Sequence, residues 1–314
     1  MSNTTILVTG STGFIGKALV SALLKPGVKV IAPVRSLGAE NYSEQHTQIT
    51  VPDLADINSK LFQQYSPDTV IHVAAKAHIV GVPLSEFRRV NTEATLHLAR
   101  LAADAGVRRF IFLSSIGVHG ISNIFPFKVT DKPTPMEDYA VSKLEAEVGL
   151  KQVAQQTGME VVILRPPLVY GPDAPGNFGK LANLARKNLP LPLGAIHNKR
   201  SLVALDNLVD LIITCIDHPK AANQTFLVSD DQDVSTAELL QMMTKAAGKT
   251  PRLIPVPMSW LKFVGKLTGK QAVVDRLCGN LQVDIRHTKE TLGWTPPITV
   301  EEGIDRCFTL VTNS

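Results

Sequence analysis

The chain has few cysteines and no long hydrophobic run, and each scarcity excludes a class of protein. Its three cysteines, Cys215, Cys278 and Cys307, have neither zinc-site spacing nor the pattern of a disulfide framework. We therefore expect buried thiols in a reducing compartment. No apolar run reaches the roughly 20 residues that cross a membrane. No basic stretch precedes the first apolar residues, so we expect no signal peptide and no membrane partner, and a cytoplasmic location.

Aromatic residues and clustered charge are also scarce. Aromatics make up 5% of the 314 residues, the net charge is only +4, and lysines and arginines never form a run. This composition favours binding of small anions over nucleic acid. His72 and His78 have no carboxylate or cysteine at ligand spacing, so no metal is expected. An apolar content of 44% supports a core for two domains, or for one large domain with an appendage.

What is present begins with a glycine-rich turn. Residues 4–8 (TTILV) are typical of a buried strand, and an amphipathic helix is predicted to about Leu24. Between them, Gly10, Gly13 and Gly16 have the spacing that admits a tight turn, a pyrophosphate and close helix packing. The alternative is an ordinary turn. We expect a dinucleotide cofactor to contact Gly10, Thr12, Gly13, Phe14, Ile15 and Gly16.

The second predicted strand, residues 28–35, indicates which cofactor. NAD-binding folds usually place an acidic residue at its end for the ribose 2′-hydroxyl. Arg35 and Ser36 stand there instead, and a guanidinium suits a 2′-phosphate. The sequence therefore favours NADP(H), with NAD(H) possible. The alternative is that Arg35 only caps a surface loop.

Further strands are predicted at residues 48–51, 69–75, 108–114 and 161–164, alternating with helices at 84–105 and 138–157. This order predicts an α/β fold with a doubly wound parallel Rossmann sheet, whose ligands bind at the carboxyl ends of the strands. Asp53 is expected either to accept from the adenine amino group or to cap a helix. The other strand-end positions assigned to the cofactor are Leu54, Ala74 and Ala75.

The composition shifts at Pro172 toward proline, glycine and asparagine. We predict an NAD(P)-binding domain at 1–171 and a smaller substrate-binding domain mainly at 172–314. A helix at 207–217 and a strand at 226–229 are expected to return to the main sheet, as part of a segment of about 200–230.

Three side chains suggest hydride chemistry. Tyr139 and Lys143 are four residues apart, so they share a helix face. Tyrosine has a pKa of roughly 10, and a neighbouring ammonium stabilises its phenolate. Ser115, at a strand end, can donate to a substrate oxygen. Together they suit proton transfer by Tyr139 beside a nicotinamide, with Lys143 also holding the nicotinamide ribose. The alternative is an exposed helix face.

In combination with the glycine turn, these motifs make the chain resemble an extended short-chain dehydrogenase/reductase of the NAD-dependent nucleotide-sugar epimerase/dehydratase family. The likeness covers nearly the whole chain. The matching motifs are residues 9–16 (TGSTGFIG), 113–115 (LSS), 139–143 (YAVSK), 165–172 (RPPLVYGP), 200–207 (RSLVALDN) and 292–296 (LGWTP).

The resemblance implies a Rossmann domain with a C-terminal substrate domain, Ser115, Tyr139 and Lys143 as the catalytic set, and a homodimer formed through two long helices per subunit. Arg200 matches an arginine that pairs with the diphosphate of the UDP-sugar. The other substrate positions it implies are Asn177 at a helix start, Leu191 beside the uracil, and Arg276, for which a solvated surface is the alternative.

Three departures bear on the reaction. Pro167 replaces an asparagine common in the epimerases, His119 stands where tyrosine is usual, and Arg35 replaces the NAD-selecting acid. The pattern is most similar to the UDP-N-acetylquinovosamine dehydrogenase branch, beside the UDP-glucose 4-epimerase-like proteins. We therefore expect a C4 ketoreductase of a UDP-4-keto-6-deoxy-N-acetylhexosamine in surface-polysaccharide synthesis. The alternatives are a 4-epimerase of UDP-glucose or UDP-N-acetylglucosamine and, from another class, a non-catalytic redox-sensing module.

Overall fold

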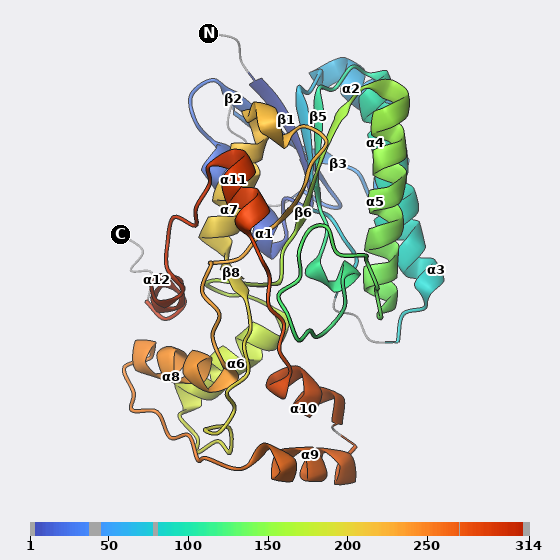
Figure 1. Cartoon of the computed structure of the whole chain (residues 1–314). Coiled ribbons are helices and arrows are strands. Elements are labelled where there is room, and N and C mark those ends of the chain that lie inside the picture. Colours follow the sequence, from blue (N-terminus) through green and yellow to red (C-terminus); the bar gives the residue numbers. More distant parts are fainter. Residues whose placement is uncertain (1–3, 38–44, 78–80, 270, 310–314) are drawn as a thin grey trace.

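Seven parallel strands form the main sheet of this computed structural model, which describes residues 4–37, 45–77, 81–269 and 271–309 (Figure 1). In spatial order they are β3 (His46–Thr50), β2 (Val28–Val34), β1 (Thr4–Thr9), β4 (Thr69–His72), β5 (Arg109–Leu113), β6 (Glu160–Arg165) and β9 (Thr225–Leu227). The strand order reverses between β1 and β4, which is where open parallel sheets bind ligands. The predicted doubly wound α/β fold is confirmed.

Helices cover both faces of this sheet, as Figure 1 shows. One face carries α1 (Phe14–Leu23), α7 (Leu205–Asp217) and α11 (Arg286–Leu292), over a core that includes Val8, Leu19 and Leu208. The other carries α2 (Ser59–Tyr65), α4 (Ala94–Asp104) and α5 (Asp138–Thr157), over a core that includes Leu98, Phe112 and Leu150. β-Branched and leucine side chains fill both layers, as expected for strands buried on both faces.

The predicted strand at 69–75 is too long. β4 ends at His72, although the amide of Val73 still donates to the carbonyl of Thr9 at 3.2 Å. The amide of Lys76 donates instead to the side chain of Asn91, at 2.8 Å. The backbone therefore leaves the sheet just where it passes the glycine turn.

The predicted helix at 84–105 is not uniform. It consists of α3 (Leu84–Phe87), a π-helical segment (η2, Arg88–Glu93) and α4. The fully buried Asn91 lies in the π-helical segment, where its amide group reaches both the chain after β4 and Ser142 on α5. Widened turns of this kind often occur where a side chain must be aimed at a particular partner.

Part of the chain beyond residue 171 returns to the main layers. α7 packs on α1, and β9 pairs with β6, whereas β8 (Leu202–Ala204) pairs with β7 (Leu168–Tyr170) in a separate two-stranded sheet. The remaining helices surround this small sheet or lie below it: α6 (Gly176–Lys187), α8 (Thr236–Ala246), α9 (Met258–Leu267), α10 (Gln271–Cys278) and α12 (Val300–Arg306). The domain boundary at 171 stays a prediction.

Candidate active site

The turn between β1 and α1 is so tight that two of its positions admit only glycine. Gly10 has a φ of +73°, and a Cβ atom there would lie 2.6 Å from the amide nitrogen of Ala74. A Cβ atom on Gly16 would lie 2.0 Å from the carbonyl oxygen of Gly10. Gly13 is the N-cap of α1 and gives it no side-chain cap, so the first amides of the helix are available to an anion. The hydroxyl of Ser11 is buried beside them, without a hydrogen-bond partner among the described residues.

The neighbouring positions offer backbone rather than side chains. The ring of Phe14 packs beside Gly171 and against the hydrophobic cluster around the small β7–β8 sheet. Ile15 packs on the core beneath α1. Thr12 is exposed on the turn. The amides of Phe14 and Ile15 are therefore what these two residues present to a phosphate.

Other predicted cofactor residues follow the strands on either side of β1. Arg35 is exposed directly after β2. Leu54 is half-buried after β3, and Ala74 and Ala75 follow β4, with Ala74 against the glycine turn. The structure thus gathers these positions along one edge of the sheet.

Asp53 caps a short helix, which is one of the two roles expected for it. Its Oδ1 accepts from the amide of Ala55 at 3.1 Å, at the start of a short 3-10 helix (η1, Leu54–Asp56), and its Oδ2 pairs with Arg89 at 2.7 Å. The hydrogen bond from Arg89, reinforced by the Ala55 amide, lowers the pKa of this carboxyl group. The carboxylate is therefore already engaged on both oxygens.

Tyr139 and Lys143 occupy one side of α5, as the spacing predicted. Tyr139 is half-buried and meets the ring of Phe87 edge to face, with ring centroids 6.2 Å apart. Lys143 is only 1% exposed, and its Nζ lies 4.1 Å from the centre of the Phe112 ring on β5. The alternative of an exposed helix face is therefore wrong for Lys143. A buried amine needs a stabilising neighbour, and the Phe112 ring is one.

Ser115 follows β5 and is held beside α5. Its Oγ accepts from the amide of Gly117 at 3.1 Å, which caps the 3-10 helix η3 (Ile116–Val118). A Cβ atom on Gly117 would lie 3.3 Å from that Oγ and 3.4 Å from the Cβ of Ala140 on α5. The first turn of α5 and the Ser115 hydroxyl are therefore separated by little more than one glycine.

Burial shifts both titratable groups of the pair. It raises the pKa of Tyr139 to about 12. It lowers the pKa of Lys143 to about 7, although the Glu147 carboxylate acts in the opposite direction. Burial therefore keeps the phenol protonated near neutrality and brings the titration of the amine close to pH 7.

A buried polar network, which sequence reasoning did not identify, lies behind this pair. Glu147 accepts from the Ser114 hydroxyl at 2.5 Å and from two nitrogens of Arg165, at 2.9 and 2.5 Å. Arg165 Nη1 also donates to Nε2 of His119 at 2.7 Å. The available signal was spacing, because Glu147 comes four residues after Lys143 and so extends the same helix face.

A second buried chain runs from β1 to the π-helical segment. The Thr95 hydroxyl donates to the carbonyl of Asn91 at 2.8 Å, so it must accept from Nε2 of His72, at 2.9 Å. Nδ1 of His72 then accepts from the Thr9 hydroxyl at 2.6 Å. The imidazole is thereby held neutral and in one tautomer, stacked on Phe112 beneath Lys143. His78 lies outside the described residues.

These two histidines are expected to make the fold acid-sensitive. Burial, together with Arg165, lowers the pKa of His119 to about 4, and burial lowers that of His72 to about 3. Below roughly pH 6.5 the unfolded chain therefore takes up protons that the folded chain does not. The contribution of these histidines to the free energy of unfolding is fully present above that pH. It falls as the pH drops toward 4, by about 1.4 kcal/mol per pH unit for each histidine.

Urea unfolding at a series of pH values measures this slope. His119→Asn should reduce it by the contribution of one histidine, whereas His197→Asn, at an exposed position, should leave it unchanged. An identical slope in wild type and His119→Asn would show that His119 titrates alike in both states.

The two predicted arginines of the substrate site lie next to each other. Arg200 is half-buried, and its Nη1 donates to the carbonyls of Arg276 and Gly279, at 2.9 and 3.1 Å. Burial and the charge of Arg276 lower the pKa of Arg200. The exposed Arg276 pairs with Glu137, which precedes α5, at 2.5 Å. A pair of cations with a depressed pKa on one of them is suited to an anion with two charges.

The other two substrate positions lie elsewhere in the lower part. Asn177 is exposed in the first turn of α6. Leu191 is half-buried and exchanges backbone hydrogen bonds with the chain at 252–254, at 3.0 and 2.8 Å. In the described part of the chain, the hydrogen bonds of Arg200 Nη1 go to Arg276 and Gly279 and to neither Asn177 nor Leu191.

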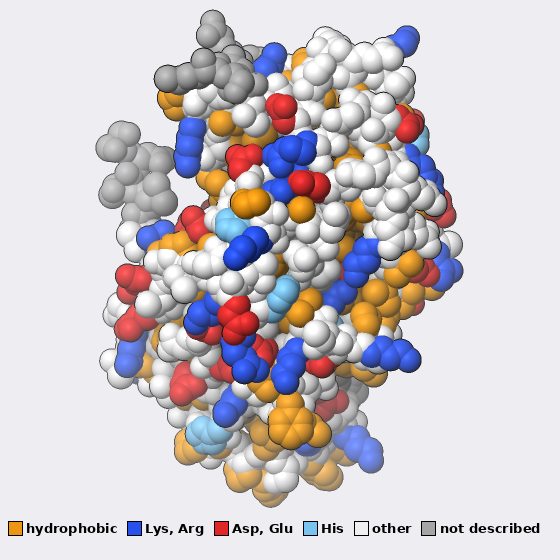
Figure 2. Space-filling view, turned by 45° about the horizontal axis from the view of Figure 1, so that its top comes forward, with side chains coloured by type: hydrophobic (Ala, Val, Ile, Leu, Met, Phe, Trp, Pro, Cys, Tyr) orange, Lys and Arg blue, Asp and Glu red, His pale blue; other side chains and the backbone are white. Residues whose placement is uncertain are grey.

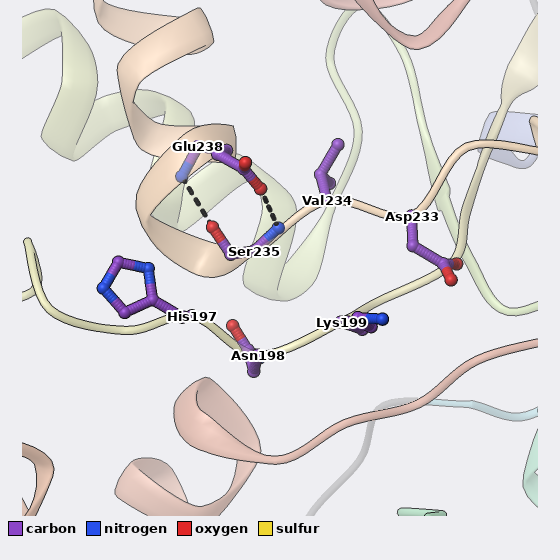
Figure 3. Close-up of a pocket in the computed structure, with 7 residues that line it drawn as sticks. All are labelled: His197, Asn198, Lys199, Asp233, Val234, Ser235 and Glu238. Atoms are coloured by element: carbon purple, nitrogen blue, oxygen red, sulfur yellow. Dashed lines mark hydrogen bonds between the residues drawn. The ribbon is translucent and has the colours of Figure 1, made fainter. Parts of the chain in front are cut away.

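A polar hollow of about 340 Å³ lies beside residues 197–199, just before Arg200 (Figure 3). Its polar groups already serve the fold. Ser235 and Glu238 form the reciprocal cap of α8, and Asp233 accepts from Ser201 and Gln282. It contains none of the predicted site residues, and we do not regard it as a substrate site. Within the described residues, no His, Cys, Asp and Glu side chains are grouped to hold a metal, and no helix has the length and apolar character to cross a bilayer.

Comparison with known proteins gives consistent results. The NAD dependent epimerase/dehydratase family model matches residues 6–229. A UDP-glucose 4-epimerase of Vibrio cholerae is 50% identical over 309 residues, which cover 95% of this chain and 92% of that protein.

Solved structures share the fold. A UDP-glucose 4-epimerase from Thermotoga maritima, determined with UDP-glucose, has a TM-score of 0.79 at 24% identity and covers 97% of both chains. A UDP-glucuronic acid 4-epimerase from Bacillus cereus, determined with NAD, also has a TM-score of 0.79, at 21% identity, and covers 97% of both chains.

Proposed function

Since this chain belongs to the NAD-dependent epimerase/dehydratase family of nucleotide-sugar enzymes, we propose that it inverts C4 of a UDP-hexose. The observation that carries this proposal is the 50% identity to the Vibrio cholerae UDP-glucose 4-epimerase along almost the whole of both chains. UDP-glucose and UDP-galactose are the substrates to test first.

The sequence alone favoured the C4 ketoreductase, and the comparisons favour its alternative. Ketoreductase and epimerase use the same side chains and differ in whether the cofactor leaves after each turnover. The preference for NADP inferred from Arg35 has no support among the relatives, and a structural relative was determined with NAD. We therefore propose a resident NAD. Joint retention of Ser115, Tyr139 and Lys143 is an argument against the non-catalytic module.

The glycine turn fits a dinucleotide on its own geometry. Side chains are excluded at Gly10 and Gly16, the start of α1 has no side-chain cap, and the Ser11 hydroxyl is buried without a partner among the described residues. These groups and the amides of Phe14 and Ile15 would hold the pyrophosphate. When bound, the nicotinamide supplies a hydride acceptor and donor for C4 of the sugar.

The side chains of α5 would then handle the proton. Tyr139 would first pass its own proton to the neutral amine of Lys143, and the resulting phenolate would take the proton of the C4 hydroxyl and later return it. Because burial raises the pKa of Tyr139 to about 12, this step needs positive charge next to the phenol. Lys143, whose pKa burial lowers to about 7, would accept the phenol proton and become the ammonium that stabilises the phenolate. Ser115 already accepts from Gly117, so its proton remains to be donated to the sugar oxygen.

Arg200 and Arg276 would bind the diphosphate of the UDP group. The guanidinium of Arg276 would exchange Glu137 for phosphate oxygens, while Arg200 is already fixed by two carbonyls. Asn177 and Leu191 stay proposals for the diphosphate and the uracil.

The test of the proposed function is interconversion without added cofactor. Purified protein incubated with UDP-glucose should form UDP-galactose, resolved by anion-exchange chromatography, with no net change in absorbance at the nicotinamide wavelength. In deuterated water the product should carry no deuterium at C4, because the hydride is returned rather than exchanged. Turnover that consumes NADPH in proportion to product would instead establish the ketoreductase.

Arg35 is expected to matter for the phosphorylated cofactor only. Arg35→Ala should lower the affinity for NADPH by about tenfold, which corresponds to one charge-assisted hydrogen bond. The affinity for NADH should be nearly unchanged. Isothermal titration of cofactor-stripped protein measures both affinities, with Arg100→Ala, at an exposed residue of α4, as the control. Equal losses for both cofactors would show that Arg35 does not meet the ribose phosphate.

A homodimer through α4 and α5 is also proposed. These helices pack side by side on the sheet and leave Val148 of α5 51% exposed. Light scattering should give twice the chain mass, and Val148→Glu should halve it.

A further inference from the structure

Helix α9 carries an apolar face whose large side chains are about half exposed or more. Trp260, Phe263, Val264 and Leu267 follow the spacing of one helix face and are 63%, 57%, 49% and 71% exposed. In Figure 1 this helix lies across the bottom of the molecule, below α10. Large exposed apolar groups in one cluster mark a binding surface rather than scattered surface residues.

The rest of the helix explains why this face points away from the protein. Gly265 is the one buried residue of α9, and a Cβ atom there would lie 2.7 Å from the side chain of Val274 on α10. Around the helix, Gly265 falls opposite Phe263 and Leu267. The helix therefore docks by its glycine side and exposes its large side chains. The rings of Trp260 and Phe263 pack on each other, 6.5 Å apart and at 79°.

Basic residues predominate around the face, although Asp275 on the neighbouring α10 is exposed as well. Residues 249–274 contain five lysines and arginines and no aspartate or glutamate. Two of them, Lys262 and Lys266, are exposed on α9 itself, between its docking side and its apolar face. Figure 2 shows hydrophobic side chains at this lower end of the molecule, with Lys or Arg side chains close by. The net charge of the whole chain is only +4, so this end is distinctly basic.

We propose that α9 is seated on the surface of an anionic phospholipid bilayer. Trp260, Phe263, Val264 and Leu267 would enter the boundary between headgroups and acyl chains, and Lys262 and Lys266 would contact lipid phosphates. Tryptophan and phenylalanine are favoured at that depth. A second copy of the chain is a poorer occupant, because pairing the two faces would bring two basic edges together. The helix has ten residues and is about 15 Å long, so it lies on the membrane and does not cross it.

The expectation of no membrane partner was based on the length of hydrophobic runs, which does not test a helix lying on a surface.

The proposed membrane-binding helix is also close to the arginines proposed to bind the substrate. α9 packs on α10, and Arg200 donates to the carbonyls of Arg276 on α10 and of Gly279 just after it. The arginines proposed to bind the diphosphate would therefore lie near the bilayer surface.

The chain offers its own reporter. It has two tryptophans, and Trp294 is 5% exposed and bonded to Asp210. In the full-length Trp294→Phe variant only Trp260 emits. Vesicles of equal parts phosphatidylcholine and phosphatidylglycerol should shift its emission to shorter wavelength, and lipids brominated on the acyl chain should quench it. If this variant does not fold, co-sedimentation of the wild type with the same vesicles measures binding directly.

Matched variants separate charge from apolar contact. Lys262→Glu/Lys266→Glu should weaken vesicle partitioning by at least about 25-fold, since each lysine near the surface contributes roughly fivefold. Lys25→Glu/Lys220→Glu, with the same charge change at exposed sites elsewhere, should bind like wild type. Phe263→Ser/Leu267→Ser should abolish both the shift and the quenching.

Three results would overturn the proposal. One is no binding to the anionic vesicles by wild type. Another is equal binding to vesicles of phosphatidylcholine alone that is indifferent to the lysine variants. The third is a concentration-dependent emission shift without lipid, accompanied by a larger mass in light scattering that Phe263→Ser/Leu267→Ser removes, which would make the face an interface between two copies.

Discussion

Tyr139→Phe should lower kcat for UDP-hexose epimerisation by about 10²- to 10⁴-fold, the range that a positioned acid–base group contributes. The substitution removes one oxygen from a half-buried ring and leaves its edge contact with Phe87 in place. NAD binding, followed by fluorescence titration, should therefore persist. Coupled detection of the product sugar measures the rate.

Tyr65→Phe is the matched control. The Tyr65 hydroxyl, at the end of α2, accepts from the neighbouring Gln64 at 3.0 Å and has no assigned part in the proposed site, so losing it should leave turnover unchanged. If Tyr139→Phe turned over at the wild-type rate, the proton would have to be moved by another group and the proposed chemistry of α5 would be wrong. If NAD binding were lost as well, the phenol would be a binding group rather than a proton carrier.

Arg165→Met should lower the free energy of unfolding by about 3–5 kcal/mol, because it leaves a buried carboxylate without its cation. The side chains of Arg165 and Glu147 are only 4% and 1% exposed. Without the guanidinium, Glu147 keeps only the Ser114 hydroxyl among the partners given above. A fall in Tm on the order of 10 °C is expected, measurable by calorimetry or urea unfolding.

Two further variants give this prediction its controls. Glu147→Gln/Arg165→Met removes both charges and should recover much of the loss, because the cost arises from the isolated charge rather than from the missing pair. Arg306→Met breaks an ion pair with Asp206 in which both side chains are about half exposed, and should cost less than about 1 kcal/mol. If Arg165→Met were no worse than Arg306→Met, the network would contribute little to the fold.

The main sheet was predictable because its strands and helices are encoded locally. Strands such as β1 and β6 each contain a short apolar run (ILV and VVIL), and the spacing of Tyr139 and Lys143 is a property of any helix. The end of β4 at His72 and the π-helical segment were not predictable, because both depend on Asn91 bonding to Lys76 and Ser142. Contacts between residues so far apart have no local pattern.

The buried network and the choice of cofactor show the same limit. Arg165 and Glu147 are 18 residues apart with no local pattern that links them, and the packing of β6 against α5 brings their charges together. The absence of an acid after β2 was used to infer NADP, but Arg35 is exposed, and which ribose it meets depends on where its side chain reaches. Residue type at one position was too little to decide between two cofactors.

The arrangement on α5 has a consequence for how the chain can change over time. Tyr139, Lys143 and Glu147 share one side of a single helix of 20 residues, so their alignment depends on nothing but an unbroken count of residues. Deleting one residue between them would rotate everything downstream by about 100°, carrying the amine away from Phe112 and the carboxylate away from Arg165 together. An insertion or deletion within this stretch should therefore abolish activity, and related chains should differ in length before Asp138 or after Thr157.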